Sequence, residues 1–394
     1  MKRKIAVFTG NRAEYGMQYP ILRAIERTGC FEHYLLVSGA HLEEDFGHTS
    51  QEISKDGFRI YREVALRTPG DSLFGTAQAI GSGILSVSEA LHELRPDLLL
   101  VYADRFESFA ALIAGTQMGI PTAHVEGGDL TEGGALDDSV RHAMTKLAHI
   151  HFTTNTEATR RILSLGEEPW RVFEVGFPAL DLIAEGLYAS PKEIAETYNL
   201  DLMHPLVVFT QHSVATEYEK ADFQIKESLA ALEILSQKKC QIIVTYPNND
   251  AGGKRIIRAI EQWSQKSRPG VQVHKSVGRF VYHGLLNVCG RVGRGVCVGN
   301  SSSGIKETPA LGCPSVNIGD RQKGRLRGNN VLNVQYDCEE IVSAVDRGLH
   351  DEEFRECCRT GENPYGKGGA GRTIADVLAQ ISLDERLIKK KLTY

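Results

Sequence analysis

The feature that most constrains the fold is a regular alternation between short apolar runs and longer stretches with helical periodicity. The apolar runs are rich in Val, Ile and Leu with few polar positions between them, as is typical of strands buried on both faces of a parallel sheet. Strands of this kind separated by about 10–15 helical residues indicate βαβ units. The sequence therefore predicts an α/β protein built on parallel sheets.

The first half of the chain predicts one doubly wound, Rossmann-like domain. The expected strands are Lys4–Thr9, Tyr34–Ser38, Asp97–Tyr102, Thr122–Val125 and Ile150–Thr153. The expected helices are Gln18–Thr28, Thr76–Leu94, Phe106–Gln117 and Asp137–Ala148.

A second series of elements predicts another α/β domain, and at about 150 residues per domain 394 residues suffice for two or three. We place the boundary in the loose stretch 177–205, with an N-terminal domain at 1–180 and a C-terminal one at 181–372. The expected strands are Leu206–Thr210, Gln241–Thr245, Val271–His274, Gly295–Val298 and Ser315–Ile318. The expected helices are Glu217–Lys238, Lys254–Gln265, Ile305–Leu311, Thr373–Ile381 and Asp384–Leu392. We interpret the lysine run 389–391 as the solvated end of the last helix.

Composition excludes several classes of protein. The formal net charge of −5 gives no general attraction to nucleic acid. The longest clean apolar run, Leu98–Ala103, is too short to span a bilayer, and no signal-peptide core follows the basic N-terminus. The eight cysteines include no CxxC pair, which indicates reduced thiols. We therefore expect a cytoplasmic protein that binds neither nucleic acid nor membrane.

Two parallel sheets in tandem predict a binding site in the cleft between the domains, because ligands bind beyond the carboxyl ends of such strands. Polar residues directly after strands are thus the candidates. In Thr9–Gly16, a glycine turn, free backbone N–H groups and Arg12 could bind a phosphate. The alternative is a plain strand-to-helix turn. Asp104 follows the next strand and is either a site carboxylate, held ionised by Arg105, or a helix N-cap.

The segment 124–142 is the richest in chemistry. A strand that contains His124 ends, and a glycine-rich loop with several acids follows. A helix then opens with Asp137 as its expected N-cap, beside Arg141. Crowded carboxylates raise one another's pKa, which suits acid/base catalysis. No spacing typical of a metal site supports the rival interpretation of a metal cluster. The acids in question are Glu126, Asp129, Glu132, Asp137 and Asp138.

The second domain carries a predicted diphosphate site. Gly299–Glu307 joins a strand to a helix through three serines, Ser301, Ser302 and Ser303, and Glu307 is placed to accept from a ribose diol. A basic segment, 321–327, lacks the aromatics of a nucleic-acid stripe and suits a phosphate clamp. His212, just past a strand, is either a site residue or a histidine satisfied by hydrogen bonds.

Over nearly its whole length the sequence resembles the hydrolysing UDP-N-acetylglucosamine 2-epimerases of sialic-acid and related nonulosonic-acid pathways. The resemblance implies two Rossmann-type domains in a GT-B-like arrangement, residues 373–394 packed back on the first domain, and UDP held mainly by the second. The motifs that carry it are Thr9–Gly16, Ser38–His41, Asp104-Arg105, His124–Gly128, Asp137–His142, Pro247–Asp250, Asn300–Gly304 and Gly319–Arg325.

Carried over by position, the resemblance implies roles for individual residues. The positions that match catalytic residues are Asp104, Glu126, Asp137 and His212. The nucleotide-binding matches are Arg12, Ser301, Ser302, Glu307 and Arg321, and His41, Arg105, Arg141 and Ser303 complete the predicted substrate site. The non-hydrolysing sister enzymes have a Gln where this chain has Ala40, and an Arg-Arg-Glu-Asn run where it has 213–216. Both differences favour the hydrolysing branch.

The implied reaction converts UDP-N-acetylglucosamine to N-acetylmannosamine and UDP through a 2-acetamidoglycal, with no metal or redox cofactor. Two departures from the common pattern, Tyr102-Ala103 before Asp104 and a longer loop at 129–136, leave the sugar open. UDP-2,4-diacetamido-2,4,6-trideoxyhexose (UDP-N,N'-diacetylbacillosamine) is the alternative substrate. A GT-B glycosyltransferase and a non-enzymatic UDP-sugar-binding regulator are the rival functions. We expect a homodimer or homotetramer.

Overall fold

The computed structural model describes residues 2–42, 50–66, 72–131, 136–248, 250–266 and 268–394. The chain divides into two compact units. The first unit comprises residues 1–130, 134–181 and 365–394, and the second comprises 131–133 and 182–364. The C-terminal residues thus belong to the same unit as the N-terminal ones.

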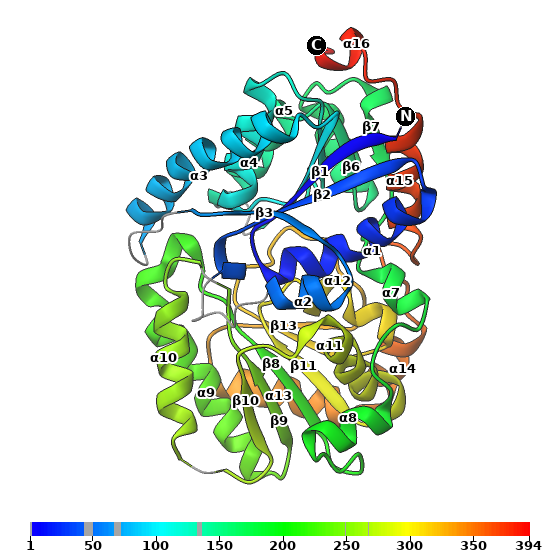
Figure 1. Ribbon diagram of the computed structural model, residues 1–394. Coiled ribbons are helices and arrows are strands. Elements are labelled where there is room, and N and C mark those ends of the chain that lie inside the picture. The colour runs from blue at the N-terminus through cyan, green and yellow to red at the C-terminus, as the bar shows by residue number, and fades with distance from the viewer. Residues whose placement is uncertain (1, 43–49, 67–71, 132–135, 249, 267) are drawn as a thin grey trace. The chain divides into compact units, whose positions relative to one another are not determined.

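The first unit is built on a seven-stranded sheet in the order β3-β2-β1-β4-β5-β6-β7, with every pairing parallel (Figure 1). The strand order reverses direction between β1 and β4, which is the switch point where such sheets leave a crevice for a ligand. The strands are β1 (Arg3–Thr9), β2 (Phe31–Ser38), β3 (Ile60–Val64), β4 (Leu98–Tyr102), β5 (Thr122–Val125), β6 (Ile150–Thr153) and β7 (Val172–Glu174).

Helices cover both faces of this sheet. Alternate residues of one strand point to opposite faces, and both sets are buried. In β1, Ile5 and Val7 pack in one buried cluster while Ala6 and Phe8 pack in another. Helix α15, in red in Figure 1, lies against α1. The helices are α1 (Arg12–Thr28), α2 (Ser50–Lys55), α3 (Leu73–Leu94), α4 (Phe106–Gln117), α5 (Leu136–Leu147), α6 (Thr156–Ser164), α15 (Ala370–Gln380) and α16 (Glu385–Ile388). Helix α7 (Leu180–Ala184) begins in the first unit and ends in the second.

The second unit has a six-stranded parallel sheet in the order β10-β9-β8-β11-β12-β13, with its switch point between β8 and β11. The strands are β8 (Leu206–Thr210), β9 (Gln241–Thr245), β10 (Val271–His274), β11 (Gly295–Gly299), β12 (Ser315–Ile318) and β13 (Val331–Val334). The helices are α8 (Pro191–Tyr198), α9 (Ala221–Gln237), α10 (Gly253–Ser264), α11 (Gly278–Asn287), α12 (Ser303–Lys306), α13 (Cys338–His350) and α14 (Glu352–Thr360).

The predicted fold class, with two parallel-sheet Rossmann-like domains, is confirmed. Three strands that the sequence did not predict, β3, β7 and β13, lie at sheet edges, where partial exposure weakens the apolar signal. The helix expected over 305–311 is broken: α12 ends at Lys306 and a 3-10 helix covers Thr308–Leu311, with Pro309 near its start. Of the helix expected over 384–392, only α16 is helical.

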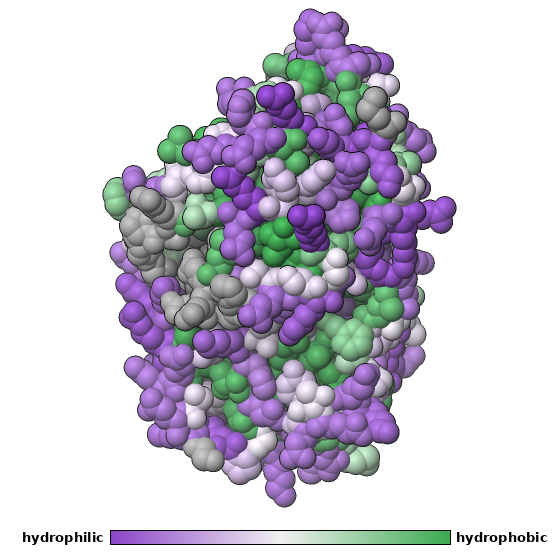
Figure 2. Space-filling model, viewed as in Figure 1, coloured by the Kyte–Doolittle hydropathy of each residue, from purple (hydrophilic) through white to green (hydrophobic). Residues whose placement is uncertain are grey.

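On the face drawn in Figure 2, hydrophilic side chains predominate and hydrophobic ones form separate small groups. Within the described part of the chain, no helix combines the length and apolar character needed to cross a membrane.

Candidate functional site

Two turns with unusual backbone geometry follow β4 and β5 in the first unit. Ala103 has φ +53° and Glu126 has φ +67°, both in the left-handed region that non-glycine residues rarely adopt. The Ala103 turn is held at both ends: its N–H donates to the carbonyl of Val125 at 2.9 Å, and Nε2 of His124 donates to its carbonyl at 2.6 Å. Such strain costs about 1–3 kcal/mol and clusters at functional sites. The two turns place Asp104 and Glu126 at the carboxyl edge of the sheet.

Arg141 joins three acidic segments of the first unit. Its buried guanidinium forms an ion pair with Asp104 after β4, and it donates to the carbonyl of Asp129 at 2.7 Å and to Asp138 Oδ1 at 3.0 Å. Helix α5 carries Arg141 and Asp138 three residues apart, so both lie on one side of its first turns. A guanidinium shared between two carboxylates and a carbonyl gives a rigid site, because its planar group fixes the direction of each bond.

The structure decides between the two alternatives for Asp104 and corrects the local predictions for Arg105 and Asp137. The N-cap of α4 is Arg105 and not Asp104, and Asp104 pairs with Arg141. Arg105 directs its guanidinium to Glu107, at 3.1 and 3.2 Å, and not to Asp104 as predicted. Helix α5 begins at Leu136, so Asp137 lies inside its first turn and is not the N-cap. For Asp104, the distant partner Arg141 outweighs the local contact that sequence proximity favours.

A second buried acid lies under the turn that follows β1. Glu14 Oε2 accepts from the N–H of Gly10 at 2.6 Å, and Ser108 donates to Oε1. Burial raises the pKa of Glu14 to about 8. The side chain of Asn11 caps α1 by accepting from the N–H of Glu14 at 3.0 Å, which leaves Arg12 as the first helical residue. A carboxyl group with a raised pKa thus lies at Glu14, which the sequence analysis did not single out.

The turns after β1 and β2 meet over Glu107, which is fully buried. Gly39 has φ +57°, and a Cβ there would lie 2.9 Å from Glu107 Oε1 and 2.6 Å from the carbonyl of Gly10, so only glycine fits. His41 follows this turn and shares a hydrogen bond of 3.1 Å with the hydroxyl of Thr9. Burial lowers the pKa of His41 to about 3, so its imidazole is neutral at physiological pH.

The structure describes only part of the predicted acidic loop. Residues 132–135, which include Glu132, lie outside the described residues. Among the residues that the structure does describe, no three His, Cys, Asp or Glu side chains are arranged to hold a metal ion.

In the second unit, Asn300 connects the loops after β8, β11 and β12. Its side chain accepts from the N–H of His212 at 2.7 Å and donates to the carbonyl of His212 at 2.9 Å. Its own carbonyl accepts from Gln322 Nε2 at 2.8 Å and from Arg321 Nη1 at 3.1 Å. The structure therefore brings the predicted residues His212 and Arg321 to one asparagine.

The orientation of His212 fixes which nitrogen carries its proton. Nδ1 accepts from the N–H of Asn248 at 3.1 Å, so in the neutral ring the proton is on Nε2. His212 thus presents an N–H donor at Nε2, and the backbone N–H of Asn248 holds its buried ring on the other side.

The serine-rich turn after β11 depends on close backbone approach. Gly299 has φ +131°, and a Cβ there would lie 1.9 Å from the carbonyl of Thr210 on β8. Ser301, Ser302 and Ser303 follow, and the N–H of Ser303 donates to Ser301 Oγ at 3.4 Å. Because α12 has four residues, the helix dipole at this turn is smaller than the sequence predicted.

Glu307 has a partner that the sequence did not indicate. His283 Nε2 donates to Glu307 Oε2 at 3.1 Å, and both side chains are buried. His283 lies on α11, a helix that was not predicted, so no sequence signal linked the two residues.

In the basic segment, Arg325 and Arg327 donate to Gln322 at 2.6 and 3.0 Å, so these two cations organise their own loop.

The chain matches a known protein family over most of its length. Residues 23–379 match the family model described as UDP-N-acetylglucosamine 2-epimerase. The chain belongs to this family. It is 30% identical over 355 residues, 90% of this chain and 89% of the relative, to "GDP/UDP-N,N'-diacetylbacillosamine 2-epimerase (hydrolyzing)" of Campylobacter jejuni. The resemblance drawn from the motifs is thus confirmed.

Further relatives cover the chain equally well. The "UDP-N,N'-diacetylbacillosamine 2-epimerase (hydrolyzing)" of Legionella pneumophila is 29% identical over 394 residues, all of both chains. The "UDP-N-acetylglucosamine 2-epimerase" of Neisseria meningitidis is 29% identical over 383 residues, 96% of this chain and 94% of the relative. A solved structure of UDP-GlcNAc 2-epimerase from N. meningitidis bound to UDP-GlcNAc superposes with a TM-score of 0.79 at 19% identity, covering 96% of this chain and all of that one. This superposition establishes the shared fold.

Proposed function

We propose that this epimerase-family member is a hydrolysing UDP-sugar 2-epimerase, which converts UDP-N-acetylglucosamine and water to N-acetylmannosamine and UDP. The observation that carries the proposal is the arrangement in the first unit: Asp104 is locked to Arg141, and Glu126 occupies a strained turn on the neighbouring strand. Positioned carboxylates of this kind suit proton transfer at a carbon whose proton must be both removed and returned. A protein that only binds a UDP-sugar has no need of them.

The reaction proceeds in two halves. In the first, a carboxylate removes the proton from C2 of the sugar, the anomeric C1–O bond breaks, and UDP leaves with the bonding pair, giving a 2-acetamidoglycal. In the second, water adds its hydroxyl to C1 while a proton is delivered to C2 from the opposite face, giving the free manno sugar. We assign the proton transfers to Asp104, Glu126 and Asp137, and the Nε2–H of His212 to a hydrogen bond that supports the departing group.

The second unit supplies the nucleotide site in this proposal. Ser301, Ser302 and Ser303 offer hydroxyl and backbone donors to the diphosphate, and Arg321 beside them offers a cation. Glu307, oriented by His283, accepts from the ribose hydroxyls. From the first unit, Arg12, His41 and Arg105 complete the predicted substrate contacts.

A second sugar has specific support. Relatives from C. jejuni and L. pneumophila, at 30% and 29% identity, are named for UDP-N,N'-diacetylbacillosamine, whereas the N. meningitidis relative at 29% is named for UDP-N-acetylglucosamine. Identities this close do not separate the two sugars. We therefore propose the diacetamido-trideoxy sugar as the second candidate substrate, with the same chemistry at C1 and C2. A cytoplasmic homodimer or homotetramer stays a prediction, which light scattering would test.

Turnover in deuterium oxide, followed by proton NMR, tests the proposal with each UDP-sugar in parallel. Hydrolytic epimerisation would release UDP and a free manno-configured sugar in equal amounts, with deuterium at C2. A non-hydrolysing enzyme would give two UDP-sugars in equilibrium, and a glycosyltransferase would leave C2 protonated. Release of a gluco-configured, undeuterated sugar would refute the proposal for both substrates.

A further inference from the structure

The C-terminal segment is docked on the first unit by a buried arginine. Arg171, fully buried, donates to the carbonyls of Leu387 at 2.6 Å, Arg386 at 2.8 Å and Lys389 at 3.3 Å. The aromatic ring of Trp170 has the guanidinium groups of Arg171 and Arg386 at 4.2 and 4.4 Å from its centroid. These contacts hold the backbone of residues 386–389 in one path and so direct the residue that follows.

That residue, Lys390, caps the C-terminal end of helix α5. Its ammonium donates to the carbonyls of Thr145 at 3.1 Å, Lys146 at 2.9 Å and Ala148 at 2.6 Å. The last carbonyls of a helix have no N–H partner within it, so they need donors from elsewhere. The sequence analysis interpreted the run 389–391 as solvated; that interpretation is wrong for Lys390, whose side chain is 17% exposed.

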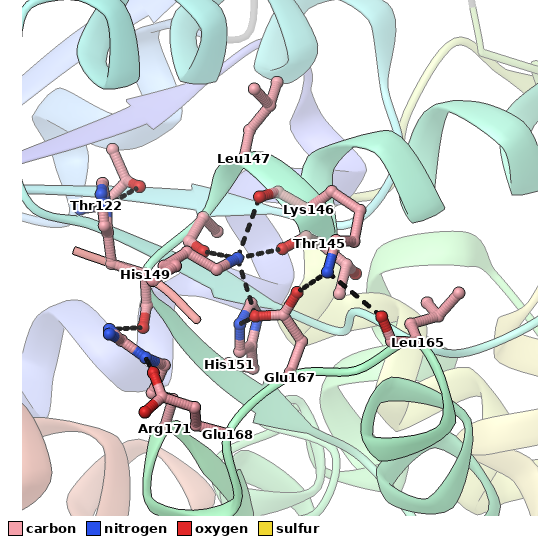
Figure 3. Close-up of polar contacts among 12 residues, drawn as sticks. Thr122, Thr145, Lys146, Leu147, His149, His151, Leu165, Glu167, Glu168 and Arg171 are labelled. Atoms are coloured by element: carbon pink, nitrogen blue, oxygen red, sulfur yellow. Dashed lines mark hydrogen bonds and ion pairs between the residues drawn. The ribbon is translucent and has the colours of Figure 1, made fainter. Parts of the chain in front are cut away.

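The same ammonium neutralises a buried carboxylate. Glu167, 1% exposed, forms an ion pair with Lys390 at 2.7 Å. It also accepts from Lys146 at 2.7 Å and from His151 at 3.0 Å, contacts that Figure 3 marks with dashed lines. Removing the Lys390 ammonium would therefore take away both the helix cap and a partner of a buried charge. Two sets of partners therefore hold the Lys390 ammonium at the end of α5.

Helix α5 carries predicted site residues at its other end, where Asp137, Asp138 and Arg141 occupy the first two turns. The helix has twelve residues and is roughly 18 Å long, and it is stiff enough that a tilt at one end moves the other. Arg141 makes directional bonds to two carboxylates and a carbonyl, so a small displacement disturbs all of them.

We propose that Lys390 is a positioning residue for catalysis: by fixing the C-terminal end of α5, it holds Arg141, and through Arg141 also Asp104, in the geometry that turnover requires. This inference rests on the proposed function. It differs from a role in general stability because it requires turnover to fall in protein that remains folded.

The lysine run provides its own controls. Lys390→Met keeps most of the stem and removes the ammonium, while Lys389→Met and Lys391→Met remove the same charge from exposed neighbours. We expect kcat to fall by about tenfold or more in Lys390→Met, with KM and the Kd for UDP little changed, because misplacing a site by about 1 Å costs up to about a hundredfold in rate. The two controls should keep the wild-type kcat.

Amide hydrogen exchange at residues 136–148 tests the anchoring without substrate. We expect faster exchange in Lys390→Met than in both controls. An unchanged kcat in folded Lys390→Met would overturn the inference, and so would a loss of kcat that only matches the unfolded fraction. If Lys390→Met does not fold, Lys390→Gln replaces it with the same expected results. Absence of turnover in the wild-type protein would instead refute the proposed function, while exchange would still report on the anchoring.

Discussion

At the carboxyl edge of the first unit's sheet, polar side chains meet as opposite charges, whereas in the second unit they meet mainly as neutral amides, hydroxyls and backbone groups. Arg141 pairs with Asp104 and Asp138 in the first. Asn300 ties His212 and the basic loop together in the second. Paired charges limit how an acid is oriented, which suits proton transfer. Neutral donors are positioned by the backbone of the loops that carry them, and such donors suit the binding of an anion.

The backbones differ in the same sense. The tight turns after β11 and β12 use glycines, Gly299 and Gly319, at positive φ. The turns after β4 and β5 place Ala103 and Glu126 there, so these two turns carry strain that the turns at Gly299 and Gly319 avoid. In the proposed function the first unit serves reactivity and the second serves binding, and each role can be tested separately.

The largest effect is expected from the carboxylates of the first unit. Glu126→Gln and Asp104→Asn keep size while removing a proton-transfer group, so turnover should fall by about 10²–10⁴-fold. UDP affinity should stay unchanged, since the nucleotide is assigned to the second unit. Coupled UDP-release assays and calorimetry measure the two quantities. Glu157→Gln, at an exposed acid of α6, is the control, and near wild-type turnover in either variant would remove that residue from the mechanism.

The reverse pattern is expected in the second unit. Arg321→Ala and Ser302→Ala should weaken UDP binding by about 1–3 kcal/mol, the range for a charged hydrogen bond. Lys238→Ala, at an exposed cation of the second unit that is paired with Asp346, should have little effect. Calorimetric titration with UDP alone distinguishes them. Unchanged affinity in both test variants would contradict the placement of the diphosphate.

Buried Glu14 predicts a pH dependence that belongs to the first unit. Its pKa in the folded protein, about 8, lies above the ordinary value of 4.5, so the folded state retains the proton longer than the unfolded state. Its contribution to stability is complete below pH 4.5 and is lost as the pH rises through 8. Between pH 6.5 and 8 we expect Glu14 to lower the free energy of unfolding by about 1–2 kcal/mol.

Urea denaturation across this range, in wild type and Glu14→Gln, isolates the effect because the variant lacks the titrating group. The neutral histidines His41 and His124 have lowered pKa values of about 3, so they act below pH 6.5 and do not interfere. Equal slopes of stability against pH in the two proteins would show that Glu14 is ionised in the folded state.

The smallest effect is expected from relieving strain. Ala103→Gly should raise the free energy of unfolding by up to about 1 kcal/mol, because left-handed geometry costs alanine about 1–2 kcal/mol and glycine's extra entropy offsets part of the gain. Ala110→Gly, in the middle of α4, should instead destabilise the protein by about 1 kcal/mol or more. Thermal and urea denaturation compare the pair. Destabilisation in both variants would mean that the turn at Ala103 carries no strain.

The sequence by itself determined the parallel-sheet architecture, the family, and the positions after strands where polar residues gather. These depend on local patterns: apolar runs of strand length, helical periodicity between them, and glycine-rich turns at their ends. Edge strands such as β3 and β13 were not predicted, because partial exposure removes the continuous apolar signal. The residue types suited to acid/base chemistry and phosphate binding were likewise visible in the motifs.

Only the tertiary structure decided which side chains pair. Sequence proximity favoured Arg105 as the partner of Asp104, but the partner is Arg141, 37 positions away. It also favoured solvent for Lys390, which is held against the end of α5. The physical reason is that hydrogen bonds and ion pairs depend on distance in space, and burial lets one well-placed distant group outweigh a neighbour in the chain. The sheet brings such groups together, and no spacing in the sequence records it.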